Sequence, residues 1–199
     1  MTSGTTLAPG FADPSLEAQV AFRLVLDAMA HPGRIKTFGN DVPASPGPLD
    51  DAAFALALTL LDFETPTWLD RKLTEPEVVE SLRFHCGCPI VGAQGDAAFA
   101  WIGDASVMPP FSEFDHGTPD YPDRAATLVV QVNGLAEREG WTLTGPGIDG
   151  TTRLRVLGLP SDFVERWAVN RDAFPNGIDM IFTFGRQLVC MPRTTQLEV

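Results

Sequence analysis

Residues 174–195, FPNGIDMIFTFGRQLVCMPRTT, decide the fold because they hold two apolar runs joined by a glycine turn. The runs DMIFTF (179–184) and QLVCMP (187–192) flank Gly185 and Arg186, a pattern that predicts a β-hairpin. DMIFTF is apolar at odd and even positions alike, so both faces of this strand should be buried. Other elements must therefore cover the sheet on both sides.

The rest of the chain supplies those elements. A first helix is expected to start at Asp13-Pro14, where a capping residue precedes proline, and to end at Pro32-Gly33. Further helices are expected over residues 50–65, 75–85 and 161–174. Short β-favouring runs occupy residues 97–102, 125–132, 141–144 and 151–159. Helices first and strands later predict a layered α/β domain with a mixed central sheet. One domain should span residues 1–199, with about residues 1–13 as a flexible tail.

Charge and composition exclude several roles. The formal net charge is −12, which disfavours binding to nucleic acid or to anionic lipid. Twelve of the fourteen cationic residues are arginines, so a local anion pocket remains compatible with the charge. The N-terminus lacks the basic and apolar regions of a signal peptide, and no run is long enough to cross a bilayer. With three cysteines and no disulfide framework, the sequence is expected to be cytoplasmic.

Three apparent motifs favour structural interpretations. Cys86-Gly87-Cys88 has one spacer, whereas zinc and redox pairs need more, and Cys190 is the one other cysteine, so the thiols are expected to be structural, in the core or near the surface. The sequence GPGIDG (145–150) matches a dinucleotide fingerprint, but the β-type run TTRLRV follows it, which predicts a turn between strands. The acidic run 113–123 with His116 could hold a hard cation, yet its prolines and glycine are typical of a solvated loop.

Enzyme signatures are scarce. The sequence contains no P-loop, no three-cysteine cluster and no Gly-x-Ser-x-Gly elbow. Its two lysines, Lys36 and Lys72, lie in polar sequence and are expected to be surface charges. No residue is assigned a catalytic role, and neither a metal nor a cofactor is predicted.

The strongest ligand candidate is Arg193-Thr194-Thr195, directly after a predicted strand and Pro192. An arginine beside two hydroxyls can bind a phosphate or carboxylate. The same residues could instead tie down the C-terminal tail or pair with an acid across a subunit boundary. Asp179 opens an apolar strand and needs a partner, for which an arginine is the obvious choice.

Several segments together resemble the PhnH family of bacterial carbon-phosphorus lyase systems. They are AFRLVLDAMAHPGRI, TPTWLD, SLRFH, LTGPGI, FPNGIDMIF and MPRTT, in order from about Phe22 to Thr195. The resemblance implies a three-layer α/β/α sandwich like the large domain of pyridoxal-phosphate-dependent transferases, without the cofactor. It adds Arg83 and His85 to Asp179, Arg193, Thr194 and Thr195 as ligand or interface candidates.

The resemblance also implies a function. Members of this family form homodimers and join PhnG, PhnI and PhnJ in a complex that replaces the adenine of ATP with an alkylphosphonate. We therefore expect an auxiliary subunit of this complex, with a phosphate, phosphonate or nucleotide as a candidate ligand. The alternatives are a stand-alone small-molecule transferase with a phosphate pocket and a pure interaction module.

Overall fold

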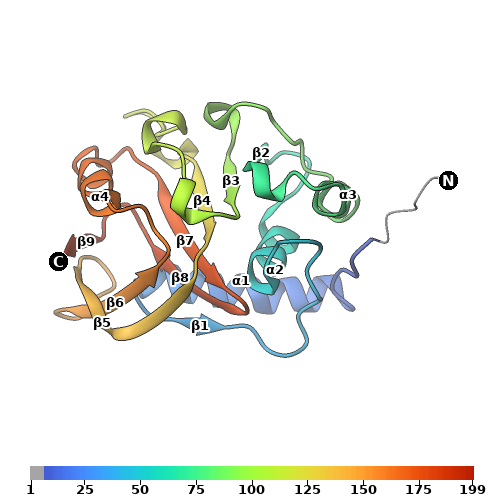
Figure 1. The fold of residues 1–199 in the computed structure, drawn as a ribbon, viewed down its shortest axis with the longest axis horizontal. Helices are drawn as coiled ribbons and strands as arrows, with labels where there is room; N and C mark the ends of the chain where they lie inside the picture. The colour runs from blue at the N-terminus through green and yellow to red at the C-terminus, as the bar shows by residue number, and fades with distance from the viewer. Residues whose placement is uncertain (1–6) are drawn as a thin grey trace.

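The computed structural model describes residues 7–199 and contains a mixed six-stranded sheet, a second three-stranded sheet and four α-helices (Figure 1). The helices are α1 (Pro14–Ala30), α2 (Asp51–Leu60), α3 (Pro76–His85) and α4 (Phe163–Asp172). The main sheet holds β1 (Lys36–Thr37), β2 (Thr67–Leu69), β3 (Phe99–Ile102), β4 (Thr127–Gln131), β7 (Asp179–Phe184) and β8 (Gln187–Met191). The second sheet holds β5 (Gly134–Thr144), β6 (Thr152–Leu157) and β9 (Gln196–Glu198). The predicted α/β class with a mixed sheet is confirmed.

The main sheet has the order β1-β8-β7-β4-β3-β2. Strands β2, β3, β4 and β7 are mutually parallel, so their carboxyl ends meet at one edge. Strands β7 and β8 form the predicted antiparallel hairpin, with Phe184 opposite Gln187. Gly185 turns this hairpin at φ 59°, a conformation that glycine adopts without steric cost.

Side chains on the central strands alternate between two cores. Trp101, Val129 and Ile181 pack with the buried faces of α1, α2 and α3. Their neighbours Ile102 and Phe182 point the other way, toward α4, β5 and β6. Burial of both faces is therefore confirmed, and the layer opposite α1–α3 consists of one helix and a small sheet (Figure 1).

Aromatic stacking fastens α4 to the small sheet. The ring of Phe163 stacks on Trp141 of β5 at 5.4 Å and on Trp167 at 6.2 Å between centroids. Trp167 Nε1 donates to the carbonyl oxygen of Thr195 at 2.9 Å, which fixes the chain just before β9. These contacts hold the C-terminal segment in place.

The structure differs from the expected elements in places where local side chains compete with the backbone. The second helix ends at Leu60 rather than at residue 65, because in the turn that follows the Thr65 hydroxyl accepts from the Asp62 backbone N–H and donates to the Asp62 carbonyl oxygen. Strands β1, β2 and β9 were not expected, since two or three residues show no periodicity. The run at residues 141–144 is only the end of β5, whose middle, residues 137–140, is polar and exposed.

The predicted N-terminal tail lies partly outside the described residues, which begin at position 7. Ala8 and Phe11 pack against the core beneath the helices. Asp13 caps α1 by accepting from the backbone N–H of Leu16 at 3.1 Å, as its position before Pro14 predicts. The assignment of a single domain stays a prediction.

Candidate ligand site at the carboxyl edge of the sheet

Arg193 and Asp179 form a tightly bonded ion pair. Asp179 accepts from the Arg193 guanidinium at 2.5 Å and 3.2 Å and from the Arg193 backbone N–H at 2.8 Å. Nη1 of the same guanidinium donates to the carbonyl oxygens of Pro122, at 2.8 Å, and Pro175. The expected arginine partner for Asp179 is thus present, and the donors of Arg193 are committed to this chain's own oxygens.

The two threonines after Arg193 have different surroundings. Thr195 is buried, and its hydroxyl has no hydrogen-bond partner among residues 7–199. Thr194 lies at a shallow depression of about 410 Å³ lined by Pro122, Phe174 and Arg193. The depression sits at the amino end of β7, away from the edge where ligands usually bind in parallel sheets.

Arg83 and His85 lie elsewhere, at the end of α3. His85 Nε2 donates to the carbonyl oxygen of Ala8 at 2.8 Å, and its ring meets Phe54 of α2 edge-on. Arg83 is exposed. Strands β4 and β3 separate β7 from β2 in the sheet, and no hydrogen bond or ion pair within residues 7–199 joins the two groups. The structure therefore does not gather the six candidate residues into one site.

The other motifs occupy structural positions. Cys88 and Cys190 are buried and Cys86 is half-buried, all with free thiols, as the sequence predicts. The sequence GPGIDG connects β5 to β6, as expected for a turn between strands. Within the described residues 7–199, no group of three or more His, Cys, Asp or Glu could hold a metal ion. The same search range contains no helix suited to spanning a membrane.

A crevice opens where the chain leaves neighbouring strands toward opposite faces of the sheet. After β2 the chain enters α3, whose Val78 and Leu82 belong to the core beneath α1 and α2. After β3 it crosses to the other face, where Ala105 and Met108 join the second core. Such a divergence at the carboxyl ends of parallel strands is the usual place for a ligand in an open α/β sheet.

Asp70 builds the floor of this crevice. Its carboxylate accepts from the backbone N–H groups of Leu73 at 3.0 Å, Gly103 at 2.8 Å and Asp104 at 3.1 Å. One side chain at the end of β2 thereby ties the short helix Arg71–Leu73 to the end of β3. A Cβ atom at position 103 would lie 2.9 Å from the Leu73 side chain, so glycine lets the end of β3 approach the short helix Arg71–Leu73 closely.

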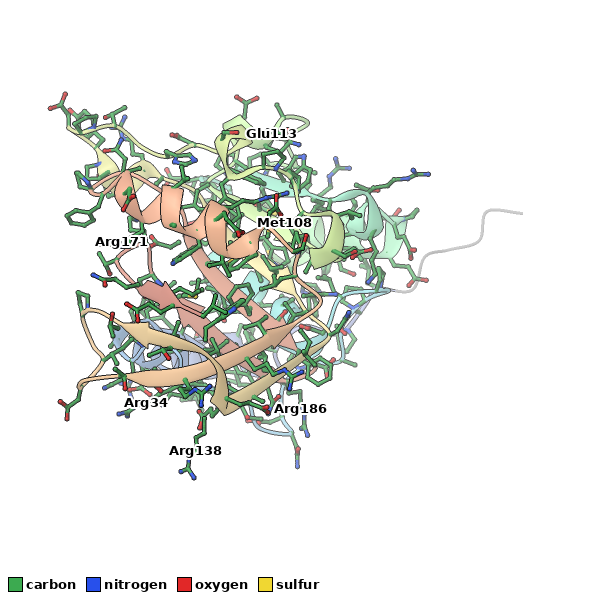
Figure 2. The ribbon with its side chains drawn as sticks, turned by 60° about the vertical axis from the view of Figure 1, so that its left-hand side comes forward. Arg34, Met108, Glu113, Arg138, Arg171 and Arg186 are labelled. Carbon is green, nitrogen blue, oxygen red and sulfur yellow. The ribbon has the colours of Figure 1, made fainter. Side chains whose placement is uncertain are left out.

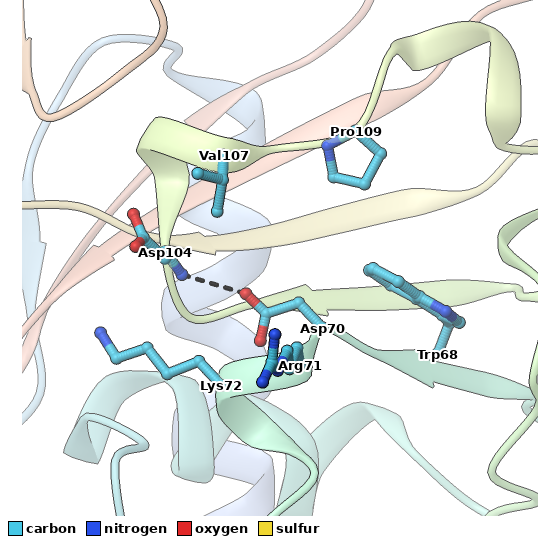
Figure 3. A pocket seen from close by; sticks show the side chains of 7 residues that line it. All are labelled: Trp68, Asp70, Arg71, Lys72, Asp104, Val107 and Pro109. Carbon is cyan, nitrogen blue, oxygen red and sulfur yellow. Dashed lines mark hydrogen bonds between the residues drawn. The ribbon is translucent and has the colours of Figure 1, made fainter.

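Seven residues line a cavity of about 470 Å³ in the crevice (Figure 3). They are Trp68, Asp70, Arg71, Lys72, Asp104, Val107 and Pro109. Figure 3 shows Val107 and Pro109 on one rim and Trp68 with Asp70 and Arg71 on the other. Lys72 Nζ donates to the Gly103 carbonyl oxygen at 2.7 Å. Asp104 accepts from the Ser106 hydroxyl, which lowers the pKa of this carboxyl.

A second, polar cavity of about 480 Å³ continues along the same edge and shares Lys72 and Asp104 with the first. Asp50 lies in its wall and caps α2 by accepting from the Ala53 backbone N–H at 2.7 Å. Gln131 accepts from the Asp50 backbone N–H at 2.8 Å and so fixes this corner. Burial raises the pKa of Asp50 to about 6.

The sequence analysis did not predict this site because it considered local motifs and not the polar residues that follow each strand. Asp70 follows β2, Asp104 follows β3 by one glycine, and Asn133 follows β4 closely. Polar residues directly after several apolar parallel strands point to one shared edge. Lys72 was expected to be a solvated charge; it is exposed, but its ammonium group is anchored at this site. Lys36 is only half-exposed and pairs with Asp27.

Comparison with known proteins agrees with the resemblance seen in the sequence. Residues 9–198 match the family described as bacterial phosphonate metabolism protein (PhnH). The chain belongs to the PhnH family. The chain is 39% identical over 199 residues to the alpha-D-ribose 1-methylphosphonate 5-triphosphate synthase subunit PhnH of Rhizobium meliloti (strain 1021). That alignment covers 100% of the chain and 99% of the relative.

A second relative is more distant. The chain is 26% identical over 181 residues to the putative C-P lyase subunit protein HtxG of Stutzerimonas stutzeri. This alignment covers 91% of the chain and 86% of the relative. Both relatives are thus matched over most of their length.

Proposed function

We propose that this chain is an auxiliary subunit of a phosphonate-activating complex, supporting transfer of an alkylphosphonate to ribose C1′ of ATP with release of adenine. The observation that carries the proposal is the end-to-end match, at 39% identity, to a ribose 1-methylphosphonate 5-triphosphate synthase subunit. Its partners are PhnG, PhnI and PhnJ, it forms a homodimer, and it works in the cytoplasm.

The hydrogen bonding of Asp70 at the carboxyl edge supports an auxiliary role. Asp70 accepts three backbone hydrogen bonds, and Asp104 accepts two from Ser106. A general base needs a free lone pair within reach of the proton that it removes. Asp70, which holds three backbone N–H groups, therefore serves the architecture of the edge, and reacting groups come from partner subunits.

The finer architecture belongs to the same proposal. Counted as layers, α1–α3, the main sheet, and α4 with the small sheet make a three-layer sandwich akin to the large domain of pyridoxal-phosphate-dependent transferases. Lys36 is engaged with Asp27 and Lys72 with Gly103. This is in keeping with a fold that does without the cofactor lysine.

Reconstitution tests the proposal against a stand-alone transferase. The purified chain alone is incubated with ATP and methylphosphonate, and adenine release is followed by chromatography. We expect no adenine from the chain alone, and release once PhnG, PhnI and PhnJ are added. Adenine release by the chain alone would establish the stand-alone transferase instead.

Gel filtration tests the partner assignment separately. Co-expressed with the three other subunits, the chain should elute in a larger complex, and alone it should elute as a dimer. Continued elution as a free dimer in their presence would contradict the assignment. Full activity of a complex carrying Arg193→Ala would argue that Arg193 holds the fold rather than a ligand.

A further inference from the structure

We propose that the crevice between the carboxyl ends of β2 and β3 binds an organic phosphonate or phosphate, with its oxyanion on Arg71 and its flat or apolar body against Trp68. This site is distinct from the Arg193 region that the sequence singled out. It is built from this chain's own residues, so it can be tested on the purified chain without partners.

The hydrogen-bonding groups around the cavity are unequally used. The carboxylates of Asp70 and Asp104 accept hydrogen bonds from this chain's own backbone and from the Ser106 hydroxyl. By contrast, the Arg71 guanidinium has no hydrogen bond or ion pair with any residue in the range 7–199. Lys72 uses one of the three donors of its ammonium group, on Gly103. The free donors of Arg71 and Lys72 therefore suit a ligand that is rich in hydrogen-bond acceptors.

The lining of the cavity is less negative than the chain as a whole. The lining carries two cations and two carboxylates, which leaves it formally neutral on a chain of net charge −12. The Asp70 carboxylate is surrounded by backbone N–H groups that offset its charge. Arg71 presents a planar fork that matches the geometry of a phosphonate or phosphate in a bidentate contact.

The opposite part of the cavity is apolar and preformed. Trp68 is half-buried, and Phe114 holds its ring edge-on at 6.0 Å between centroids. Val107, 72% exposed, and Pro109 form the facing rim (Figure 3). A fixed indole needs little ordering when a flat group stacks on it, which favours binding. The volume of about 470 Å³ falls within the usual range for small-molecule sites.

Calorimetric titration with three probes tests the two halves of the site. Phenylphosphonate and phenyl phosphate carry the oxyanion on a flat ring, and methylphosphonate lacks the ring. We expect saturable binding of at least one phenyl probe, and weaker binding of methylphosphonate. Preference between the two phenyl probes tells whether the natural ligand is a phosphonate or a phosphate ester.

Substitutions assign the binding to named side chains. Arg71→Ala should weaken the binding of the phenyl probe by about tenfold or more, the usual loss for a charge-assisted contact, while Arg71→Lys retains part of it. Trp68→Ala should weaken the phenyl probe and leave methylphosphonate unchanged, and Trp68→Phe should largely restore it. Arg138→Ala is the matched control, because Arg138 is exposed on β5 and points away from the body (Figure 2).

Circular dichroism and thermal melts of each variant show whether the fold is kept. The proposal is overturned if no probe binds saturably to the wild-type chain. It is equally overturned if folded Arg71→Ala binds the phenyl probe as tightly as Arg138→Ala does. Binding of methylphosphonate as tight as that of phenylphosphonate would contradict the role given to Trp68.

Discussion

Replacing Arg193 with methionine should destabilise the chain rather than abolish the binding of a small ligand. The substitution keeps an apolar stem of similar length and removes the guanidinium. Asp179, whose side chain is 23% exposed, then keeps only the backbone N–H of residue 193 as a donor. The carbonyl oxygens of Pro122 and Pro175 also lose the donor Nη1.

The expected loss follows from the burial of the pair. Breaking a buried ion pair by removing one partner costs about 3–5 kcal/mol. Because water still reaches Asp179 in part, we expect the lower end, about 3 kcal/mol for Arg193→Met. Asp179→Asn should cost about 2 kcal/mol, since the guanidinium keeps its two carbonyl acceptors. The double variant should lose less than the sum of the two, because the contacts are shared.

Urea unfolding of the wild type, the two single variants and the double variant measures this coupling. Arg23→Ala is the control, an exposed arginine of α1, and should change the free energy of unfolding by less than about 0.5 kcal/mol. The reasoning is refuted if Arg193→Met unfolds like the control. If the variant kept its stability and lost activity in the reconstituted complex, Arg193 would be a ligand residue after all.

Three further predictions concern a buried acid, a thiol and a turn. The pKa of Asp50 is raised by burial from 3.8 to about 6, so the folded state holds its proton more tightly and the wild type loses stability as pH rises through this window. The stability of Asp50→Asn relative to the wild type should therefore rise between about pH 4 and pH 7, by up to about 3 kcal/mol in thermal melts. A difference in stability between the two proteins that does not change with pH would contradict this prediction. Burial raises the pKa of the Cys86 thiol to about 12, so at pH 8 iodoacetamide should label it slowly in the native chain and quickly in urea, as peptide mass spectrometry can measure. Gly147→Ala should cost several kcal/mol, because a Cβ at φ 82° would strike the carbonyl oxygen of Ala30 at the end of α1. Gly150→Ala, at φ 70° with open space, should cost about 1 kcal/mol, and equal losses in urea unfolding would refute the close approach.

Local patterns account for the elements that sequence reasoning found. The hairpin of β7 and β8 follows from two apolar runs and one glycine, and the start of α1 follows from Asp13 before proline. The pairing of Asp179 with Arg193 was also within reach, because the two residues flank one hairpin and are 14 positions apart. Short strands such as β2 escaped detection because three residues carry no period.

The candidate site was harder to predict because its parts are distant in sequence. Asp70 reaches Gly103, 33 residues away, and the cavity that it floors also needs Pro109. The resemblance of the segment around His85 to the family made this residue a ligand or interface candidate, yet its ring bonds to the carbonyl oxygen of Ala8, 77 residues away. A spacing in sequence cannot report such contacts.

The sequence by itself determined which segments become helices and buried strands, and to which family the chain belongs. Hydrophobic periodicity and capping act within a few residues, so they can be seen in the order of amino acids. Only the tertiary structure decided where the crevice lies. The crevice exists because the chain leaves β2 toward one face of the sheet and β3 toward the other, and the packing of the two cores selects those faces.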